Sequence, residues 1–223
     1  MPLAYALVAM VAFILLITWA TLQAQIALAG FLNGESLWSK SQKQAVIDML
    51  NYSATGSAKD FEDFQRSFHM VEVDRVARDK VISGRFNYDQ VLRELSSGSA
   101  VPAAIPGIIF LLQHFPNAPY VGHALALWRS TDGPMAKLGV IANKLHSSYL
   151  AGAVSQNEIV RQRGRINAIN DLVEPRANKF SMTIANGAVS IGKMLYGGVL
   201  LSAAVALLLW LWMARRVLAG IRG

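Results

Sequence analysis

Two long apolar runs, one near each end of the chain, constrain its fold more than any other feature. The first 34 residues contain no Asp, Glu, Lys or Arg, and within them residues 3–22 form an apolar run of 20 residues. A helix rises about 1.5 Å per residue, so this run would be about 30 Å long, the thickness of a bilayer's hydrocarbon core. The second run, residues 194–214, holds 21 uncharged residues between Lys193 and Arg215. Both runs predict transmembrane helices.

The composition excludes an ordinary soluble globule. Hydrophobic residues make up 53% of the chain and charged residues only 16%, whereas a soluble domain carries about 25% charged residues. The chain has no cysteine, which excludes disulfides, thiolate metal sites and cysteine nucleophiles. We therefore expect a membrane protein without disulfides or thiolate sites.

A cleaved signal peptide is the alternative interpretation of the first run. Ala27-Leu28-Ala29 offers a cleavage site of the A-x-A kind. However, no Lys or Arg precedes the run, and its 20 residues exceed the usual apolar region of about 7 to 15 residues in a signal peptide. An uncleaved membrane anchor is the better prediction.

The short C-terminal tail predicts the orientation. Arg215, Arg216 and Arg222 fall in the last nine residues, and short basic flanks are typical of the cytoplasmic side. Two spans would then place the N-terminus inside and the middle of the chain outside the cytoplasm. The predicted organisation is a first transmembrane helix (residues 1–25), an extracytoplasmic domain (26–193), a second transmembrane helix (194–214) and the cytoplasmic start of a linker to an output module (215–223).

The extracytoplasmic domain is predicted to be helical almost throughout, because its apolar residues recur every three or four positions. A capping-box spacing from Ser57 to Asp60 precedes the clearest amphipathic stripe, and Gly84 should end that helix. A buried helix should start near Pro106, and residues 132–134, Asp-Gly-Pro, predict a turn. The predicted fold class is all-α, with two transmembrane helices flanking an extracytoplasmic helical bundle.

One apolar stripe runs along the final predicted helix, which should begin near Ser155 and continue past Pro175 into the second span. Its spacing of about seven residues is that of a dimer seam and also that of a helix packed on its own bundle, and both readings stay open. The dimer reading makes it a signalling helix in a homodimer. The stripe consists of Ile159, Ile166, Ile169, Val173 and Phe180.

No pattern for catalysis or for metal or cofactor binding is present, so no catalytic residue, metal site or cofactor is predicted. The four histidines form no pair at i, i+4, and neither a P-loop nor a dinucleotide fingerprint occurs. Of the net charge of +7, the tail supplies +3, and residues 35–193 supply +4, from 18 basic and 14 acidic residues. An excess spread so thinly does not predict nucleic-acid binding.

The best candidate for a ligand site lies just after the first span. Glu35, Trp38, Lys40 and Lys43 combine an indole with charges of both signs. Such a group could hold a small polar ligand or an anionic lipid headgroup. Alternatively, Trp38 packs inside the bundle and the two lysines face water.

The same residues belong to a longer motif. Residues 34–46, GESLWSKSQKQAV, resemble the opening signature of the periplasmic sensor region of bacterial membrane-bound signalling proteins. Weaker similarities follow at residues 105–108, 119–120 and 126–128. The cytoplasmic parts of such proteins are diguanylate cyclase (GGDEF), phosphodiesterase (EAL) or histidine kinase modules.

The resemblance implies a multi-pass protein of the bacterial inner membrane whose central domain is periplasmic. That domain would sense an unknown periplasmic ligand or protein and pass the stimulus to a cyclic-di-GMP enzyme or histidine kinase absent from this chain. The chain itself would then be no enzyme, and its partners would be the lipid bilayer and a second copy of itself. The competing prediction is a non-signalling membrane scaffold or assembly factor that binds another envelope protein.

Overall fold

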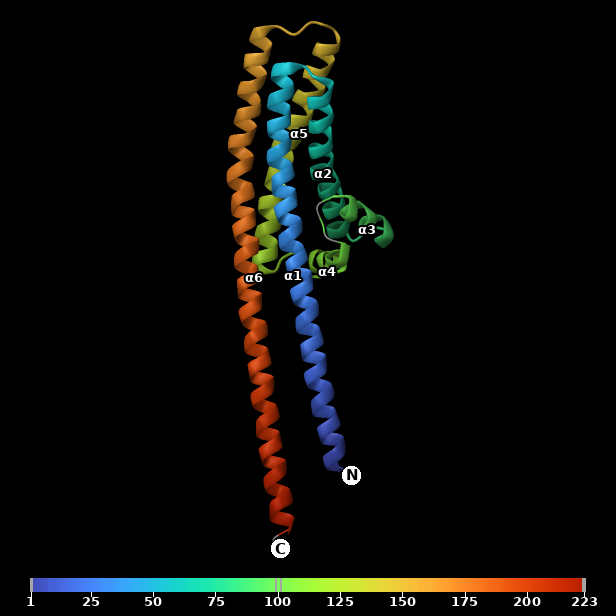
Figure 1. Ribbon diagram of the computed structural model, residues 1–223, viewed down its shortest axis with the longest axis vertical. Helices are drawn as coiled ribbons and strands as arrows, with labels where there is room; N and C mark the ends of the chain where they lie inside the picture. Colours follow the sequence, from blue (N-terminus) through green and yellow to red (C-terminus); the bar gives the residue numbers. More distant parts are fainter. Residues whose placement is uncertain (1, 99, 101, 222–223) are drawn as a thin grey trace. The chain divides into compact units, whose positions relative to one another are not determined.

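The computed structural model describes residues 2–98, 100 and 102–221, and all its regular elements there are helices, which confirms the predicted all-α class (Figure 1). The side chains of some helical residues, Glu35 among them, lie outside the description. The elements are α1 (Pro2–Thr55), α2 (Ala58–Ser83), α3 (Tyr88–Ser97), the 3-10 turn η1 (Pro102–Ala104), α4 (Ile105–His114), α5 (Pro119–Leu150) and α6 (Gln156–Ile221).

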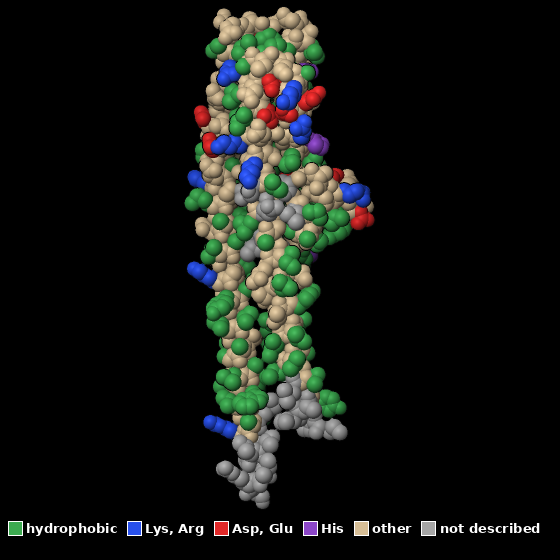
Figure 2. Space-filling model, viewed as in Figure 1, with side chains coloured by type: hydrophobic (Ala, Val, Ile, Leu, Met, Phe, Trp, Pro, Cys, Tyr) green, Lys and Arg blue, Asp and Glu red, His purple; other side chains and the backbone are tan. Residues whose placement is uncertain are grey.

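The chain divides into two compact units. One contains Met1–Ile26 and Ala188–Gly223, and the other contains Ala27–Gly187. In the first unit the described side chains of α1 and α6 are mainly apolar and exposed (Figure 2). Phe13 and Leu208, for example, are 54% and 65% exposed.

Among the described residues, one helix is long and apolar enough to cross a membrane, within Gln156–Trp212. The stretch Val8–Gln23 is apolar but shorter. The part of the chain that the structure describes thus holds one candidate for a membrane span, in the helix that contains the second apolar run. The first span remains a prediction.

The second unit is a helical bundle, in which α2 and α5 lie alongside the parts of α1 and α6 that belong to it (Figure 1). Two groups of buried apolar side chains form its core. One lies where α3 and α4 join the bundle and includes Trp38, Ile105 and Phe180. The other extends toward the turns that join α1 to α2 and α5 to α6, and includes Met49 and Leu145.

The predicted turn at residues 132–134 is wrong, because α5 continues through Pro134 without interruption. A proline inside a helix costs about 3 kcal/mol and leaves the carbonyl four residues earlier without its helical partner. Here that carbonyl, on Ser130, accepts a hydrogen bond of 2.6 Å from Nη1 of Arg176 on α6. Thr131 and Met135, on either side of the proline, are both buried, so packing keeps the helix continuous.

Other predicted helix boundaries have mixed outcomes. Gly84 ends α2 in a left-handed conformation with φ of 70°, as its position predicted. The capping box does not form, because the Ser57 side chain makes no capping hydrogen bond. The Asp60 carboxylate instead accepts a hydrogen bond from the Thr55 hydroxyl, which joins the end of α1 to the start of α2.

The apolar stripe of α6 faces the chain's own bundle. Ile166 is 0% exposed, and Ile169, Val173 and Phe180 are also buried, while Ile159 is partly buried. The four buried residues belong to the two core clusters of the same chain. In this fold the stripe thus packs on the chain's own bundle, the second of the two readings. A homodimer stays a prediction.

Candidate functional site

The structure does not bring Trp38 and the two lysines of the predicted ligand site together. On α1, Trp38 is buried at 2% exposure, whereas Lys40 and Lys43 are exposed. Nζ of Lys43 lies 3.7 Å from a carboxylate oxygen of Glu174 on α6. The side chain of Glu35 lies outside the described part. Trp38 and the lysines therefore point to different surroundings, although they are close in sequence.

Trp38 instead forms an aromatic centre with Trp128 of α5 and Phe180 of α6. Its ring centroid lies 5.6 Å from that of Trp128 and 5.1 Å from that of Phe180, with interplanar angles of 65° and 68°. Edge-to-face pairs of this kind contribute about 0.5 to 1.5 kcal/mol each beyond the burial of apolar area. The aromatic centre thus joins three long helices at one level of the bundle.

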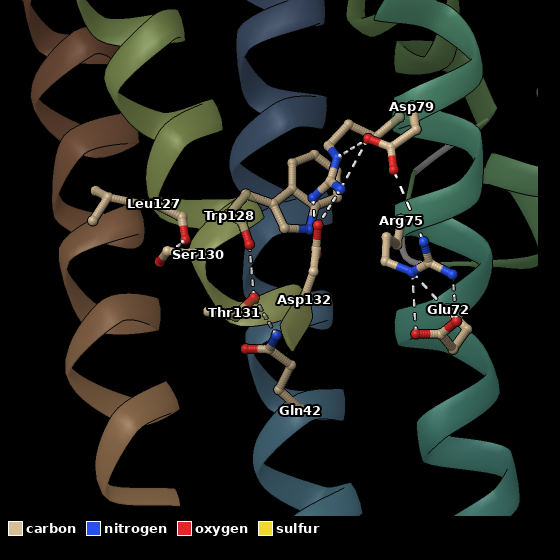
Figure 3. A network of polar contacts seen from close by, with 10 residues as sticks. Gln42, Glu72, Arg75, Asp79, Leu127, Trp128, Ser130, Thr131 and Asp132 are labelled. Carbon is tan, nitrogen blue, oxygen red and sulfur yellow. Dashed lines mark hydrogen bonds and ion pairs between the residues drawn. The ribbon is translucent and has the colours of Figure 1, made fainter. Parts of the chain in front are cut away.

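A fully buried arginine of α2 completes this region. The guanidinium carbon of Arg78 lies 4.8 Å from the centroid of Trp128, and the Arg78 side chain is 0% exposed. Its Nη1 and Nη2 donate to the two carboxylate oxygens of Asp132 at 3.2 and 2.6 Å, and its Nε donates to Asp79 at 3.0 Å (Figure 3). A two-point contact with a carboxylate and a cation–π contact hold the arginine in a single position.

A second arginine extends the network along α2. Nη2 of Arg75 donates to a Glu72 carboxylate oxygen at 2.7 Å, and its Nη1 lies 3.9 Å from Asp79 (Figure 3). The hydrogen bond to Glu72 is the main reason that the pKa of Arg75 is raised above its ordinary value. Asp79 therefore links the two arginines of α2.

The network also reaches α1 through neutral groups. Nε2 of Gln42 donates to the Thr131 hydroxyl at 3.1 Å, and that hydroxyl donates to the carbonyl of Trp128 at 2.7 Å (Figure 3). Helices α1, α2 and α5 are thus connected by polar contacts in the same part of the bundle where the aromatic centre joins α1, α5 and α6.

Two small cavities adjoin this region. The first has a volume of about 30 Å³ and is lined by Trp38, Asp74, Arg78 and Trp128, among others. The indole N–H of Trp38 is buried and has no hydrogen-bond partner among the described residues. A cavity of this volume has room for a water molecule, which could accept that hydrogen bond.

The second cavity, of about 60 Å³, lies between α1 and α6 and is lined by polar side chains including Ser39, Gln42 and Asn178. Oε1 of Gln42 is buried and lacks a partner among the described residues. Each cavity therefore combines one unsatisfied polar atom of α1 with room for water-sized polar groups. Neither is large enough for a metabolite in this conformation.

Sequence reasoning missed Arg78, Asp132 and the pairing of Trp38 with Phe180. Arg78 stands next to Asp79 in a helix rich in charge, so its sequence context is that of an exposed ion pair. Among the described residues no group of three His, Asp or Glu side chains could hold a metal ion. Comparisons of the chain with protein-family models, with curated proteins and with solved structures found no match.

Proposed function

We propose that the chain is the extracytoplasmic sensor module of a transmembrane signal-transduction protein. It would pass a periplasmic stimulus to a cytoplasmic output, either a cyclic-di-GMP enzyme or a histidine kinase. One observation carries this proposal most strongly. Helices α1 and α6 each run without interruption from an apolar end segment into the bundle, where they carry Trp38 and Phe180 of the aromatic centre.

This continuity supports signalling because a helix transmits displacement along its axis. A transmembrane signal needs an element with two arrangements that both the stimulus and the output favour differently. The aromatic centre joins α1 and α6 through Trp38 and Phe180, so a change in its packing acts on both helices. The resemblance of residues 34–46 to sensor regions supports the same function and includes Trp38.

The buried charges support a region that can change its arrangement. Burying ions is costly, and a buried ion pair often contributes little net stability compared with apolar packing. Arg78 is fully buried beside Asp132 and Asp79, and unsatisfied polar atoms of Trp38 and Gln42 lie next to cavities. A second arrangement of this region can therefore lie close in free energy to the one described, as a switching element requires.

A membrane scaffold or assembly factor is the second candidate function. The observation that favours it is the small volume of the two cavities, about 30 and 60 Å³, which is room for only a few water molecules in each. By contrast, an open groove between α2 and α5, lined by Phe64, Phe68 and Gly139 among others, is accessible to a protein partner.

A fusion experiment tests the signalling proposal. The C-terminus would be joined, in helical phase, to a cytoplasmic kinase or cyclic-di-GMP-forming module whose activity is measurable. Trp128→Phe and Asp132→Asn alter the aromatic centre and the Arg78 pair, and we expect both to change the output activity. Leu145→Ala, in the other apolar group of the core, is the control for destabilisation alone.

The outcomes separate the two functions. A change with Trp128→Phe and Asp132→Asn that exceeds the change with Leu145→Ala supports signalling through the aromatic centre. If all three inserted and folded fusions retain the parental output, the signalling proposal fails and the scaffold function is favoured.

A further inference from the structure

One stretch of the bundle lacks acidic and basic residues. Residues 95–128, 34 in number, contain no Asp, Glu, Lys or Arg. They include η1, α4 and the beginning of α5. Protein surfaces surrounded by water normally carry charged side chains, so this stretch is suited to a different environment.

Part of this stretch exposes aromatic side chains. In α4, Ile105 and Leu112 are buried in the core, whereas Phe110 on another face of the helix is 55% exposed. Phe115 and Tyr120, which follow α4, are 49% and 42% exposed. The rings of Phe110 and Phe115 contact each other, with centroids 5.9 Å apart. We call Phe110, Phe115 and Tyr120 the aromatic corner.

The aromatic corner lies at one end of the bundle. Figure 1 shows α4 at the end opposite the turn between α5 and α6. Next to α4, buried Ala104 packs so closely on Gly30 of α1 that Gly30 has no room for a Cβ atom. A Cβ on Gly187 of α6 would lie 2.9 Å from Cβ of Tyr120.

These contacts fix the level of the corner along both long helices. The bundle begins at Ala27 on α1 and ends at Gly187 on α6. Gly30 and Gly187 therefore lie at or near these two limits. The corner therefore adjoins the last residues of the bundle on α1 and α6, the two helices whose sequences continue into the predicted spans.

We propose that the aromatic corner is a membrane-docking surface, which binds the boundary between lipid headgroups and acyl chains. Aromatic rings accumulate at this boundary, and elements that lie in it bury their apolar face among the lipids. The exposed polar groups of Gln113, His114 and Asn117 beside the rings suit the hydrated headgroup region. The inference rests on the membrane spans of the proposed function.

The lack of basic residues indicates which lipid headgroups the aromatic corner should bind. Attraction to anionic lipids needs Lys or Arg near the surface, and residues 95–128 have none. The burial of apolar area therefore drives the contact. Zwitterionic phosphatidylcholine alone should bind the corner, and anionic lipid should not strengthen the contact.

Site-specific fluorescence tests this proposal, since the chain contains no cysteine. Phe110→Cys and Phe115→Cys would each carry an environment-sensitive fluorophore in the full chain reconstituted into phosphatidylcholine vesicles. Val140→Cys is the matched control, because Val140 is an apolar residue of α5 that is 69% exposed and lies outside the uncharged stretch. Val205→Cys, in the second apolar run, reports on the span itself.

We expect a lipid-attached nitroxide at headgroup depth to quench the probes at positions 110 and 115, and iodide in the water to quench them poorly. The probe at 140 should show the reverse. Equal quenching with and without anionic lipid is expected for positions 110 and 115. Circular dichroism of each labelled variant must match the parent, and the two positions serve as independent replicates.

Each contrary outcome has its own meaning. If positions 110 and 115 behave like position 140 while acyl-chain nitroxides quench position 205, the corner does not dock and the span stands. If position 205 is not quenched either, both the docking surface and the membrane spans of the proposed function are overturned. Quenching at 110 and 115 only with anionic lipid would overturn the apolar mechanism.

Discussion

At the scale of single residues, Arg78 is a charged side chain that the sequence places at the surface and the structure places in the core. Its sequence neighbours suggest an exposed ion pair, yet its side chain is 0% exposed and contacts Asp132, Asp79 and the ring of Trp128. Such a residue couples helices α2 and α5, because its charge is stable in the core only while its carboxylate partners stay in place.

Arg78→Met should be among the most destabilising single substitutions in the bundle. Removing one partner of a buried ion pair costs about 3 to 5 kcal/mol, and Asp132, whose side chain is 30% exposed, regains some of this through water. Urea unfolding in detergent, followed by circular dichroism, measures the loss. The double variant Arg78→Met, Asp132→Asn should lose less than the sum of the single losses, and strict additivity would contradict the coupling.

Trp38 offers a comparison between packing and hydrogen bonding. Trp38→Ala should cost about 3 to 5 kcal/mol through the cavity it leaves, whereas Trp38→Phe keeps a ring against Phe180 and removes the unsatisfied N–H. Trp38→Phe should therefore be much the milder change. Lys40→Ala, on the exposed face of the same helix, should stay within about 0.5 kcal/mol. Equal losses for Ala and Phe at position 38 would contradict this account.

Two tyrosines at the other end of the core predict a pH dependence. Burial raises the pKa of Tyr52 and of Tyr149 above 10.0, and Tyr149 adds to the shift of Tyr52. Tyr52 contacts Nδ1 of His146 at 2.8 Å, and Tyr149 donates to the carbonyl of Ser53 at 2.8 Å. The folded chain thus favours the neutral phenols.

This stabilisation is complete below pH 10.0, the ordinary pKa of tyrosine, and is lost as pH rises through the raised pKa of the folded state. Thermal melts at increasing alkaline pH should therefore show a falling midpoint. The slope should be smaller for the double variant Tyr52→Phe, Tyr149→Phe. An unchanged slope in that variant would show that other groups cause the alkaline loss.

At the scale of helices, α5 and α6 are joined by a hydrogen bond to a carbonyl that a proline leaves without its helical partner. Pro134 cannot donate to the carbonyl of Ser130, and Arg176 of α6 does so instead. The break in the hydrogen bonding of one helix thus creates an acceptor for the next. We expect Arg176→Ala to cost about 1 to 3 kcal/mol, the penalty for leaving a partly buried carbonyl without a partner.

The same substitution should cost less in a Pro134→Ala background, because the alanine N–H can bond to the Ser130 carbonyl within the helix. A double-mutant cycle measured by urea unfolding isolates this coupling. If Arg176→Ala costs the same in both backgrounds, the arginine acts through its packing and not through the carbonyl.

The apolar stripe of α6 gives a prediction about accessibility. Cysteines at Ile166 and Val173 should be slow to react with an aqueous thiol reagent in the folded chain, since both positions are buried, and should form few intermolecular disulfides. A cysteine at the exposed Asn167 should react readily. Ready crosslinking at 166 and 173 but not at 167 would show that the stripe is a dimer seam after all.

At the scale of the whole chain, topology is the property on which the proposed function depends. Ala58, at the start of α2, is exposed, and Gly220 belongs to the short basic tail. In intact cells an impermeant thiol reagent should label Ala58→Cys and should not label Gly220→Cys. Both should react after the membrane is permeabilised. Labelling at 220 alone would reverse the orientation and remove the basis for a periplasmic sensor.

The sequence by itself determined the local properties of the chain. Apolar runs, three-and-four spacing and the glycine at the end of α2 act over a few residues, so the helical class and several boundaries could be predicted. The buried stripe of α6 could also be identified, although its partner could not. A helix that packs on its own bundle and one that packs on a second copy require the same spacing.

Tertiary structure decided what depends on contacts between distant segments. Pro134 predicts a turn locally, but buried neighbours and Arg176 keep α5 continuous. Trp38 and Lys43 are neighbours in sequence, yet Trp38 packs on Phe180 while Lys43 pairs with Glu174 at the surface. The physical reason is common to these cases: the free energy of burial and of buried charge belongs to the assembled core, and no short stretch contains it.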